Sequence, residues 1–216
     1  MQRNMGWLEG LMRIFRATVL IVLALFASGA HSASKTILVL GDSLSAEYGL
    51  VRGSGWVSLL EQRLKTEKID AVVVNASISG ETSSGGKNRL GPLLEKYHPA
   101  VVIIELGGND GLRGLSVRAS EDNFRAMINA AKKARAKVLL AGMQIPPNYG
   151  RDYADQFAAL YPKLAKETKS PLVPFLLTGV ADRPELFQSD RIHPNAQAHP
   201  VMLSNVWLYL KPLLIK

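Results

Sequence analysis

The chain has 216 residues, of which 47% are hydrophobic and 20% charged, so one globular domain of ordinary size can bury a complete core. The formal net charge is +8, yet like charges form no long run and basic residues are not interleaved with aromatic ones, which gives nucleic-acid binding little support. Cysteine is absent, which excludes disulfides, a thiol nucleophile and cysteine-based metal sites.

The N-terminal segment has the composition of an export signal. Two arginines precede an apolar run over residues 17–27, and small residues follow that run. A basic part, a short apolar part and small residues before a cut are the three parts of a secretory signal peptide. The run is shorter than the roughly 20 residues that a membrane-spanning helix needs. We therefore predict a signal peptide over residues 1–32, a single domain over residues 33–216, and a periplasmic or secreted location.

Some features of this segment stay open. An uncleaved N-terminal anchor is the alternative to a signal peptide. Ser32 is the expected residue before the cut, although Ala30 also fits that place. Translation could also begin at Met12, which would give a more compact signal.

Strand-like and helix-like segments alternate along the rest of the chain. Runs rich in Val, Ile and Leu, typical of strands buried on both faces, lie at residues 36–40, 71–75, 100–106 and 137–141, with a weaker one at 172–175. Segments with helical spacing of apolar residues lie at 56–65, 87–97, 120–136, 154–167 and 196–214. The alternation predicts an α/β fold, a three-layer α/β/α sandwich with a central, mainly parallel five-stranded sheet.

Three candidate site residues follow three of the predicted strands. Ser43 comes three residues after the first strand, Gly80 five residues after the second, and Asn109 three residues after the third. In open α/β sheets, ligands bind outside the carboxyl ends of the strands. We therefore expect these residues to converge on one edge of the sheet.

Ser43 is the candidate nucleophile. It lies in the segment Gly-Asp-Ser-Leu-Ser, where a strand passes into a loop, although a serine there also suits a turn or a helix cap. The nucleophile elbow of the α/β-hydrolases is Gly-x-Ser-x-Gly, and here Ser45 takes the place of the last glycine. The segment therefore indicates a different type of serine hydrolase.

Asn109 and Gly80 are candidate donors to an oxyanion. Asn109 lies in Gly-Gly-Asn-Asp, after a strongly apolar run, and the glycines permit a tight turn and close approach of a ligand. A purely structural turn is the alternative, and we expect Asp110 to brace this loop. Gly80 could present a backbone N–H to an oxyanion, but a lone glycine is weak evidence.

His193 is the candidate general base. Asp190 precedes it by three residues, so a tight turn brings an acid to the same ring. Of the other histidines, His31 belongs to the predicted signal peptide and His199 lies in or beside the last helix. His98 also follows an acid by three residues, but it precedes a strand and should lie at the opposite edge of the sheet. A loop histidine satisfied by a nearby carboxylate is the structural alternative for His193.

Together, Gly-Asp-Ser-Leu-Ser, the later glycine, Gly-x-Asn-Asp and Asp-x-x-His-Pro resemble the SGNH or GDSL hydrolases, over nearly all of the chain after the predicted signal peptide. The resemblance implies the flavodoxin-like SGNH-hydrolase fold and a serine hydrolase that cleaves carboxylic esters and thioesters through an acyl-enzyme. It implies that Ser43, Asp190 and His193 are catalytic, and that the Ser43 and Gly80 N–H groups and the Asn109 amide form the oxyanion hole. It implies no metal and no organic cofactor.

Within that superfamily, residues 75–82, 106–115 and 146–150 resemble the branch of thioesterases, lysophospholipases and arylesterases. This likeness implies aryl esters, acyl-CoA and lysophospholipids as substrates. One departure from the family pattern is His199-Pro200, to which we match no role.

The substrate partner is expected to be a small acyl ester or thioester, handled by a monomer with transient contact to lipid surfaces at most. Apolar residues from loops at the same sheet edge are candidates for the acyl pocket, although ordinary packing is an equal alternative for each. These candidates are Leu44, Leu112, Ile145, Pro146 and Tyr149.

Two other function classes stay open. A metal-dependent phosphoesterase could use an oxygen- and nitrogen-rich cluster, but such enzymes ordinarily need several histidines and only His193 is well placed. The cluster would be Asp42, Asn109, Asp110, Asp190 and His193. A non-catalytic lipid-binding module with a degenerate site is the third interpretation.

Overall fold

The computed structural model describes residues 34–215, which belong to one compact unit. The predicted signal peptide, residues 1–32, lies outside the described residues. None of the helices between residues 34 and 215 is long and apolar enough to cross a membrane.

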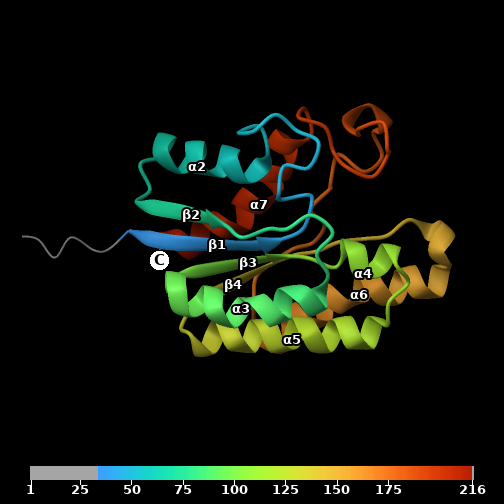
Figure 1. Cartoon of the computed structure of the whole chain (residues 1–216), viewed down its shortest axis with the longest axis horizontal. Coiled ribbons are helices and arrows are strands. Elements are labelled where there is room, and N and C mark those ends of the chain that lie inside the picture. Colours follow the sequence, from blue (N-terminus) through green and yellow to red (C-terminus); the bar gives the residue numbers. More distant parts are fainter. Residues whose placement is uncertain (1–33, 216) are drawn as a thin grey trace, which may run out of the picture. The chain divides into compact units, whose positions relative to one another are not determined.

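A five-stranded sheet forms the middle layer of this unit (Figure 1). Its strands are β1 (Lys35–Gly41), β2 (Ala71–Asn75), β3 (Val101–Glu105), β4 (Lys137–Ala141) and β5 (Leu172–Val173). They lie in the order β2-β1-β3-β4-β5, and every neighbouring pair is parallel. The predicted sheet is confirmed, and it is parallel throughout rather than mainly so.

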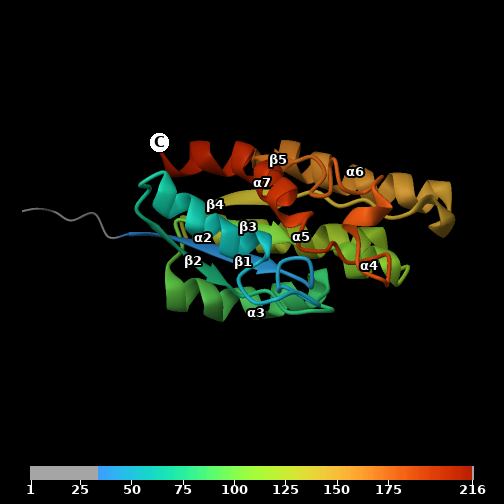
Figure 2. The same ribbon diagram turned by 90° about the horizontal axis from the view of Figure 1, so that it is seen from above.

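Helices cover both faces of the sheet. Within the described residues they are α2 (Trp56–Thr66), α3 (Ser83–Tyr97), α4 (Gly108–Leu112), α5 (Val117–Lys133), α6 (Arg151–Thr168) and α7 (His199–Leu214). Figures 1 and 2 show α2 and α7 on one face and α3, α5 and α6 on the other, so the predicted three-layer sandwich is confirmed. The largest buried side chains come from these helices: Trp56, Phe124, Phe157 and Tyr161.

The chain order of the strands creates a crevice at one edge. β1 pairs with β2 on one side and with β3 on the other, so the chain leaves β1 and β3 toward different faces of the sheet. Such a switch point is where ligands bind in doubly wound sheets. The loops that follow β1 and β3 carry Ser43 and Asn109, and they therefore open onto this crevice.

Several element boundaries differ from the predicted ones. α5 begins and ends three residues earlier than predicted, α6 begins three residues earlier and α7 begins three residues later. The boundaries of α3 and β5 differ for local reasons. α3 begins at Ser83, four residues before the predicted start, because the Thr82 side chain accepts a hydrogen bond from the Gly85 N–H and caps the helix. The glycines of this first turn have low helix propensity and hid the start of the helix. β5 is only two residues long, because Pro174 follows it and has no N–H to continue the ladder.

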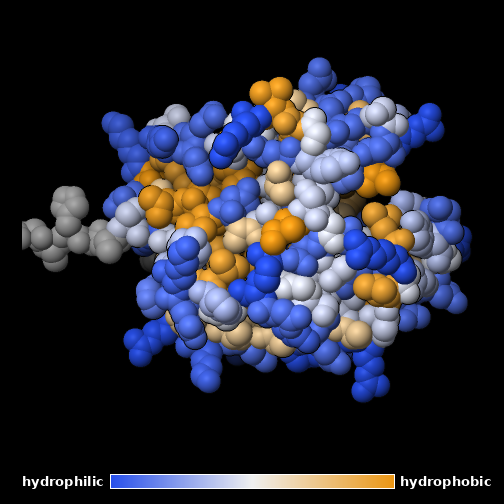
Figure 3. All heavy atoms as spheres, viewed as in Figure 1, coloured by the Kyte–Doolittle hydropathy of each residue, from blue (hydrophilic) through white to orange (hydrophobic). Residues whose placement is uncertain are grey.

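The sheet ends in an apolar edge. β2 has one neighbouring strand, and Figure 3 shows apolar side chains gathered over it, between α2 and α3. Val72 is half exposed there, while other β2 residues pack against the core. The strand has only five residues, which limits the length of backbone that this edge leaves unpaired.

Candidate active site

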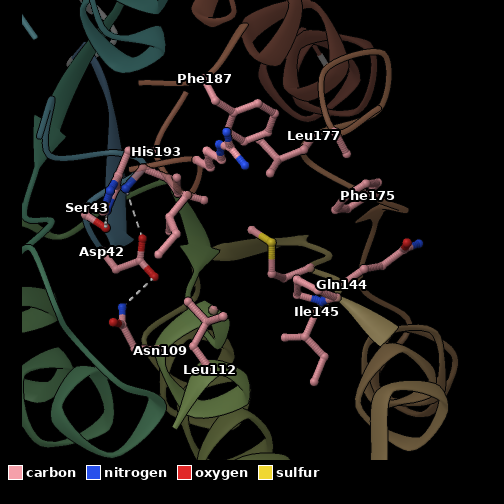
Figure 4. A pocket seen from close by; sticks show the side chains of 17 residues that line it. Asp42, Ser43, Asn109, Leu112, Gln144, Ile145, Phe175, Leu177, Phe187 and His193 are labelled. Atoms are coloured by element: carbon pink, nitrogen blue, oxygen red, sulfur yellow. Dashed lines mark hydrogen bonds between the residues drawn. The ribbon is translucent and has the colours of Figure 1, made fainter. Parts of the chain in front are cut away.

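Ser43, His193 and Asp190 form a chain of hydrogen bonds at the carboxyl edge of the sheet. The Ser43 Oγ and His193 Nε2 are joined by a hydrogen bond of 2.9 Å (Figure 4). The other ring nitrogen, Nδ1, lies 2.7 Å from an Asp190 carboxylate oxygen. With the Nδ1–H donated to Asp190, the imidazole presents a free lone pair on Nε2, which can accept the Ser43 proton.

Asp190 holds both the ring and the turn. One of its oxygens accepts the N–H groups of Ile192 (2.9 Å) and His193 (3.0 Å), and the other accepts from the His193 ring. The hydrogen bond from the His193 N–H is the main reason that the pKa of Asp190 falls to about 2. The carboxylate is therefore ionised at neutral pH and fixed in direction.

The loop that carries His193 is tied to the loop that carries Ser43. The Gln188 N–H donates to the His193 carbonyl, and the Gln188 side-chain amide donates to the carbonyls of Tyr48 and Pro194. The Tyr48 ring also packs on the His193 imidazole, with 4.4 Å between ring centroids. These contacts join two segments that are far apart in the chain.

The loop that carries Ser43 rests on a buried carboxyl group. Glu105, at the end of β3, accepts hydrogen bonds from the Asp42 N–H (3.3 Å) and the Ser45 hydroxyl (2.6 Å). The Trp56 indole N–H donates to the same hydroxyl over 3.2 Å. Gly41 leaves room for this arrangement, since a Cβ there would lie 2.7 Å from the Glu105 carboxyl.

Asn109 lies in the first turn of α4, where the sequence predicted only a turn. The helix starts directly after Gly107, whose φ of +104° favours glycine. The Asn109 amide nitrogen donates to an Asp42 carboxylate oxygen (3.1 Å) and to the Glu81 carbonyl (3.0 Å). The bond to Asp42 directs the amide toward the loop of Ser43, as Figure 4 shows, and the bond to Glu81 joins it to the loop after β2.

Gly80 lies on the loop after β2, with a φ of +80° that favours glycine. Its carbonyl accepts a hydrogen bond from the Arg113 guanidinium over 3.0 Å. Among residues 34–215, neither its N–H nor that of Ser43 donates to another group. Two backbone donors are thus available near the Asn109 amide.

Asp110 braces the base of this site, as expected. Its carboxylate accepts hydrogen bonds from the N–H and the hydroxyl of Ser83 and from the hydroxyl of Ser120. Asp110 is buried, and it joins α4 to the first turns of α3 and α5. The direction of Asn109 therefore depends on a carboxylate that does not face the cavity.

Two acidic groups lie buried behind Ser43, the candidate nucleophile. Burial raises the pKa of Asp42 to about 6, although hydrogen bonds from the Leu44 N–H and the Asn109 amide oppose that rise. Burial also raises the pKa of Glu105 well above its usual range, and the Asp42 charge adds to the effect. One Glu105 oxygen, Oε1, is buried without a hydrogen-bond partner in the described chain. Glu105 was the only charged residue of an otherwise apolar run, which was the signal that sequence reasoning missed.

A cavity of about 550 Å³ opens beside Ser43 and His193. Figure 4 shows that its walls come from the loops at the carboxyl ends of the strands and from α4. Four of the five predicted pocket residues line it, namely Leu44, Leu112, Ile145 and Pro146. Sequence reasoning missed most of the remaining wall, which is formed by Met143, Gln144, Phe175, Leu177, Ala181, Phe187, Arg191 and Ile192.

Tyr149, the fifth predicted pocket residue, does not line the cavity. It ends a single 3₁₀ turn, Pro147–Tyr149, and its side chain is 40% exposed. The segment that ends at Pro146 forms this part of the cavity wall. The 3₁₀ turn that follows leads the chain away from the wall and into α6.

The other two histidines of the domain have structural positions. His98 caps the C-terminus of α3 with a φ of 41° and precedes β3, at the opposite edge of the sheet, as expected. His199 is buried at the start of α7, and its Nδ1 accepts the Trp56 N–H over 3.0 Å. This bond accounts for the His-Pro pair to which the sequence assigned no role, because it connects α7 to the start of α2.

Comparison with known proteins supplies the family. Residues 39–201 match the model of the GDSL-like Lipase/Acylhydrolase family. The chain belongs to this family. It is 50% identical over 192 residues to the esterase TesA of Pseudomonas aeruginosa, covering 89% of this chain and 96% of that protein. It is 44% identical over 182 residues to thioesterase 1/protease 1/lysophospholipase L1 of Escherichia coli K12, covering 84% and 86%.

A crystal structure of TesA superposes on this fold with a TM-score of 0.81 at 51% identity, covering 83% of this chain and all of that one. Membership of the GDSL-like family makes this protein an ester and thioester hydrolase. Neither a metal-dependent phosphoesterase nor a non-catalytic lipid-binding module is favoured by these relatives. Among residues 34–215, no three His, Asp or Glu side chains are grouped to hold a metal ion.

Proposed function

We propose that Ser43, His193 and Asp190 form the catalytic triad of this hydrolase. His193 Nε2 takes the Ser43 proton as the Oγ attacks the ester or thioester carbonyl, and it then returns the proton to the leaving oxygen or sulfur. Water activated by the same nitrogen releases the acid from Ser43. The observation that carries this proposal is the pair of hydrogen bonds of 2.9 and 2.7 Å that flank the His193 ring.

The oxyanion would be received by the N–H groups of Ser43 and Gly80 and by the Asn109 amide. The two N–H groups have no acceptor among the described residues, whereas the amide already donates to Asp42 and to the Glu81 carbonyl. Asn109 must therefore share or turn one hydrogen when the tetrahedral intermediate forms. Catalytic hydrogen bonds are often long or poorly aligned before substrate binds, so this arrangement suits a resting site.

The substrate class follows from the cavity beside the triad. Its wall is mostly apolar, with Leu112, Ile145, Phe175 and Leu177 among its members, and burial of an acyl chain there gains about 0.8 kcal/mol per CH₂. We propose small-molecule carboxylic esters and thioesters with an apolar acyl group as substrates, including aryl esters, acyl-CoA and lysophospholipids. Triad chemistry of this kind uses no metal or organic cofactor.

We also propose that the domain is exported and acts in the periplasm or outside the cell. The support is the signal-peptide pattern of residues 1–32, together with the start of the compact unit at Ser34. We propose that the exported domain is a monomer that contacts lipid surfaces only transiently. Mass spectrometry of the N-terminus of the exported protein tests the cleavage site.

The triad is tested with Ser43→Ala. This variant should fold normally, lose covalent labelling by a fluorophosphonate probe and lose ester hydrolysis. Ser204→Ala is the matched control, because Ser204 lies exposed on α7 and its hydroxyl donates to the Pro200 carbonyl of the same helix. Labelling that survives Ser43→Ala on any other residue of the purified protein would overturn the proposal.

A further inference from the structure

The cavity beside the triad contains one permanent positive charge. Among the described residues that line it, Asp42 and His193 are titratable and belong to the catalytic network, and the rest are neutral except for Arg191. A guanidinium stays protonated at any physiological pH. An apolar cavity with a single fixed cation suits an amphiphilic substrate that carries an anionic group.

The backbone of Arg191 is held in an unusual conformation. Its φ is +59°, in the left-handed region that non-glycine residues rarely adopt. The Arg191 N–H donates to the Gln188 carbonyl over 2.9 Å, and Gln188 is anchored to the nucleophile loop. The place of Arg191 is therefore fixed relative to Ser43 by the contacts that also place His193.

The Arg191 guanidinium has no ion pair or hydrogen bond within residues 34–215. Its neighbour Asp190 forms no ion pair with it in the described chain, and the Asp190 oxygens instead accept hydrogen bonds from Ile192 and, twice, from His193. The side chain is exposed at the cavity and has its donors free. A planar guanidinium binds phosphate with two parallel hydrogen bonds.

We propose that Arg191 is a specificity-determining residue that binds an anionic group, above all a phosphate, on the leaving group of the substrate. The inference rests on the proposed triad, because His193 must pass its proton to the leaving atom and Arg191 lies two residues away on the same loop. The favoured substrates are acyl esters of a phosphate-bearing alcohol. The apolar walls receive the acyl chain while Arg191 receives the phosphate.

Matched substrate pairs test this role. The kcat/KM of the purified protein is measured for 1-butyrylglycerol 3-phosphate and for 1-butyrylglycerol, which are both soluble and differ only by the phosphate. The ratio of the two values should fall about tenfold in Arg191→Gln, mainly through KM, as expected for loss of a charged hydrogen bond. Arg191→Lys should keep part of the ratio, and added salt should reduce the wild-type ratio.

Arg135→Gln is the matched control. Arg135 is also exposed and has a φ of +64°, but it precedes β4 and so lies at the far edge of the sheet. Its variant removes one positive charge from the same backbone conformation and should keep the wild-type ratio. A fall in the ratio equal to that of Arg191→Gln would show an effect of net charge and overturn the proposal.

Two further pairs separate the remaining explanations. Palmitoyl analogues in neutral-detergent micelles should show the same preference as the butyryl pair, and a preference confined to micelles would overturn the proposal. The 4-nitrophenyl monoester of glutarate carries its charge on the acyl side, so its rate relative to 4-nitrophenyl butyrate should not depend on Arg191. Dependence there would contradict the leaving-group assignment, whereas wild-type inactivity on all butyrate esters would instead contradict the proposed function.

Discussion

The Asn109 amide nitrogen lies 3.1 Å from a carboxylate oxygen of Asp42, the residue directly before the proposed nucleophile Ser43. The candidate oxyanion donor and the nucleophile loop are therefore joined before any substrate enters. The Glu81 carbonyl accepts the other bond of that amide, so three loops meet at one side chain. The site can reposition the amide only by changing one of these two bonds.

Removal of the Asn109 amide should slow the chemical step. Asn109→Ala is expected to lower kcat by about 10²- to 10³-fold, the usual cost of losing one oxyanion donor, with a smaller effect on KM. Steady-state rates on 4-nitrophenyl butyrate check this. Asn148→Ala is the control, because Asn148 is exposed and does not line the cavity. A variant with a raised KM and an unchanged kcat would instead assign Asn109 to binding of the substrate in its ground state.

The buried Asp42 should make stability depend on pH. Its pKa is about 6 in the folded protein, against 3.8 for the unperturbed group, so its favourable contribution is complete below pH 3.8 and is lost as pH rises through 6. The wild type should lose about 3 kcal/mol of unfolding free energy from this group across that window. Asp42→Asn should lack that loss in urea unfolding at a series of pH values. Parallel curves for the two proteins would contradict the shift.

The two histidines that follow an acid by three residues should differ in their effect on catalysis. His193→Ala is expected to lower kcat by about 10⁴-fold or more, as loss of a triad member does in serine hydrolases. His98→Asn should change kcat little, because His98 caps α3 away from the cavity and asparagine tolerates its left-handed backbone. Equal losses in both variants, at equal thermal stability, would remove the proposed distinction.

Acyl-chain selectivity should depend on the cavity wall rather than on Tyr149. Leu177→Ala removes apolar contact from the wall and should lower kcat/KM for octanoate esters several-fold more than for acetate esters. Tyr149→Ala should leave that ratio near the wild-type value, because Tyr149 does not line the cavity. The readout is the octanoate-to-acetate ratio of 4-nitrophenyl ester hydrolysis. A larger change in Tyr149→Ala than in Leu177→Ala would show that the 3₁₀ turn moves onto the substrate.

The layers of the fold were predictable from local patterns. Strands such as β3 are buried on both faces, so they appear in the sequence as continuous runs of Val and Ile, and the helices between them show their own spacing. The short helix α4 was not predictable, because two of its five residues are glycines with low helix propensity. α4 begins directly after Gly107, and the hydrogen bonds of Asp110 to Ser83 and Ser120 hold it against α3 and α5. Contacts with segments remote in the chain therefore fix its position.

The residues of the candidate site were predictable where a short sequence motif contains them. Asp190 and His193 lie within one turn, and Ser43 and Asn109 each follow a strand. The support behind them was not, because Glu105 and Gln188 act through contacts with segments remote in the chain. The cavity wall was also missed, because Phe175 was placed in a predicted strand, and the stretch that follows, with Leu177 and Phe187, has neither a helical nor a strand period.

The hydrogen bond from Ser43 to His193 spans 150 residues of sequence. Ser43, the proposed nucleophile, is made early in synthesis, whereas His193, its proposed base, arrives only with the last loop before α7. A nascent or C-terminally clipped chain thus has a serine without a proton acceptor and should be chemically silent. The protein would then hydrolyse esters only after the final helix has packed against the sheet. Enzyme activity would therefore measure the fraction of chains that have completed folding.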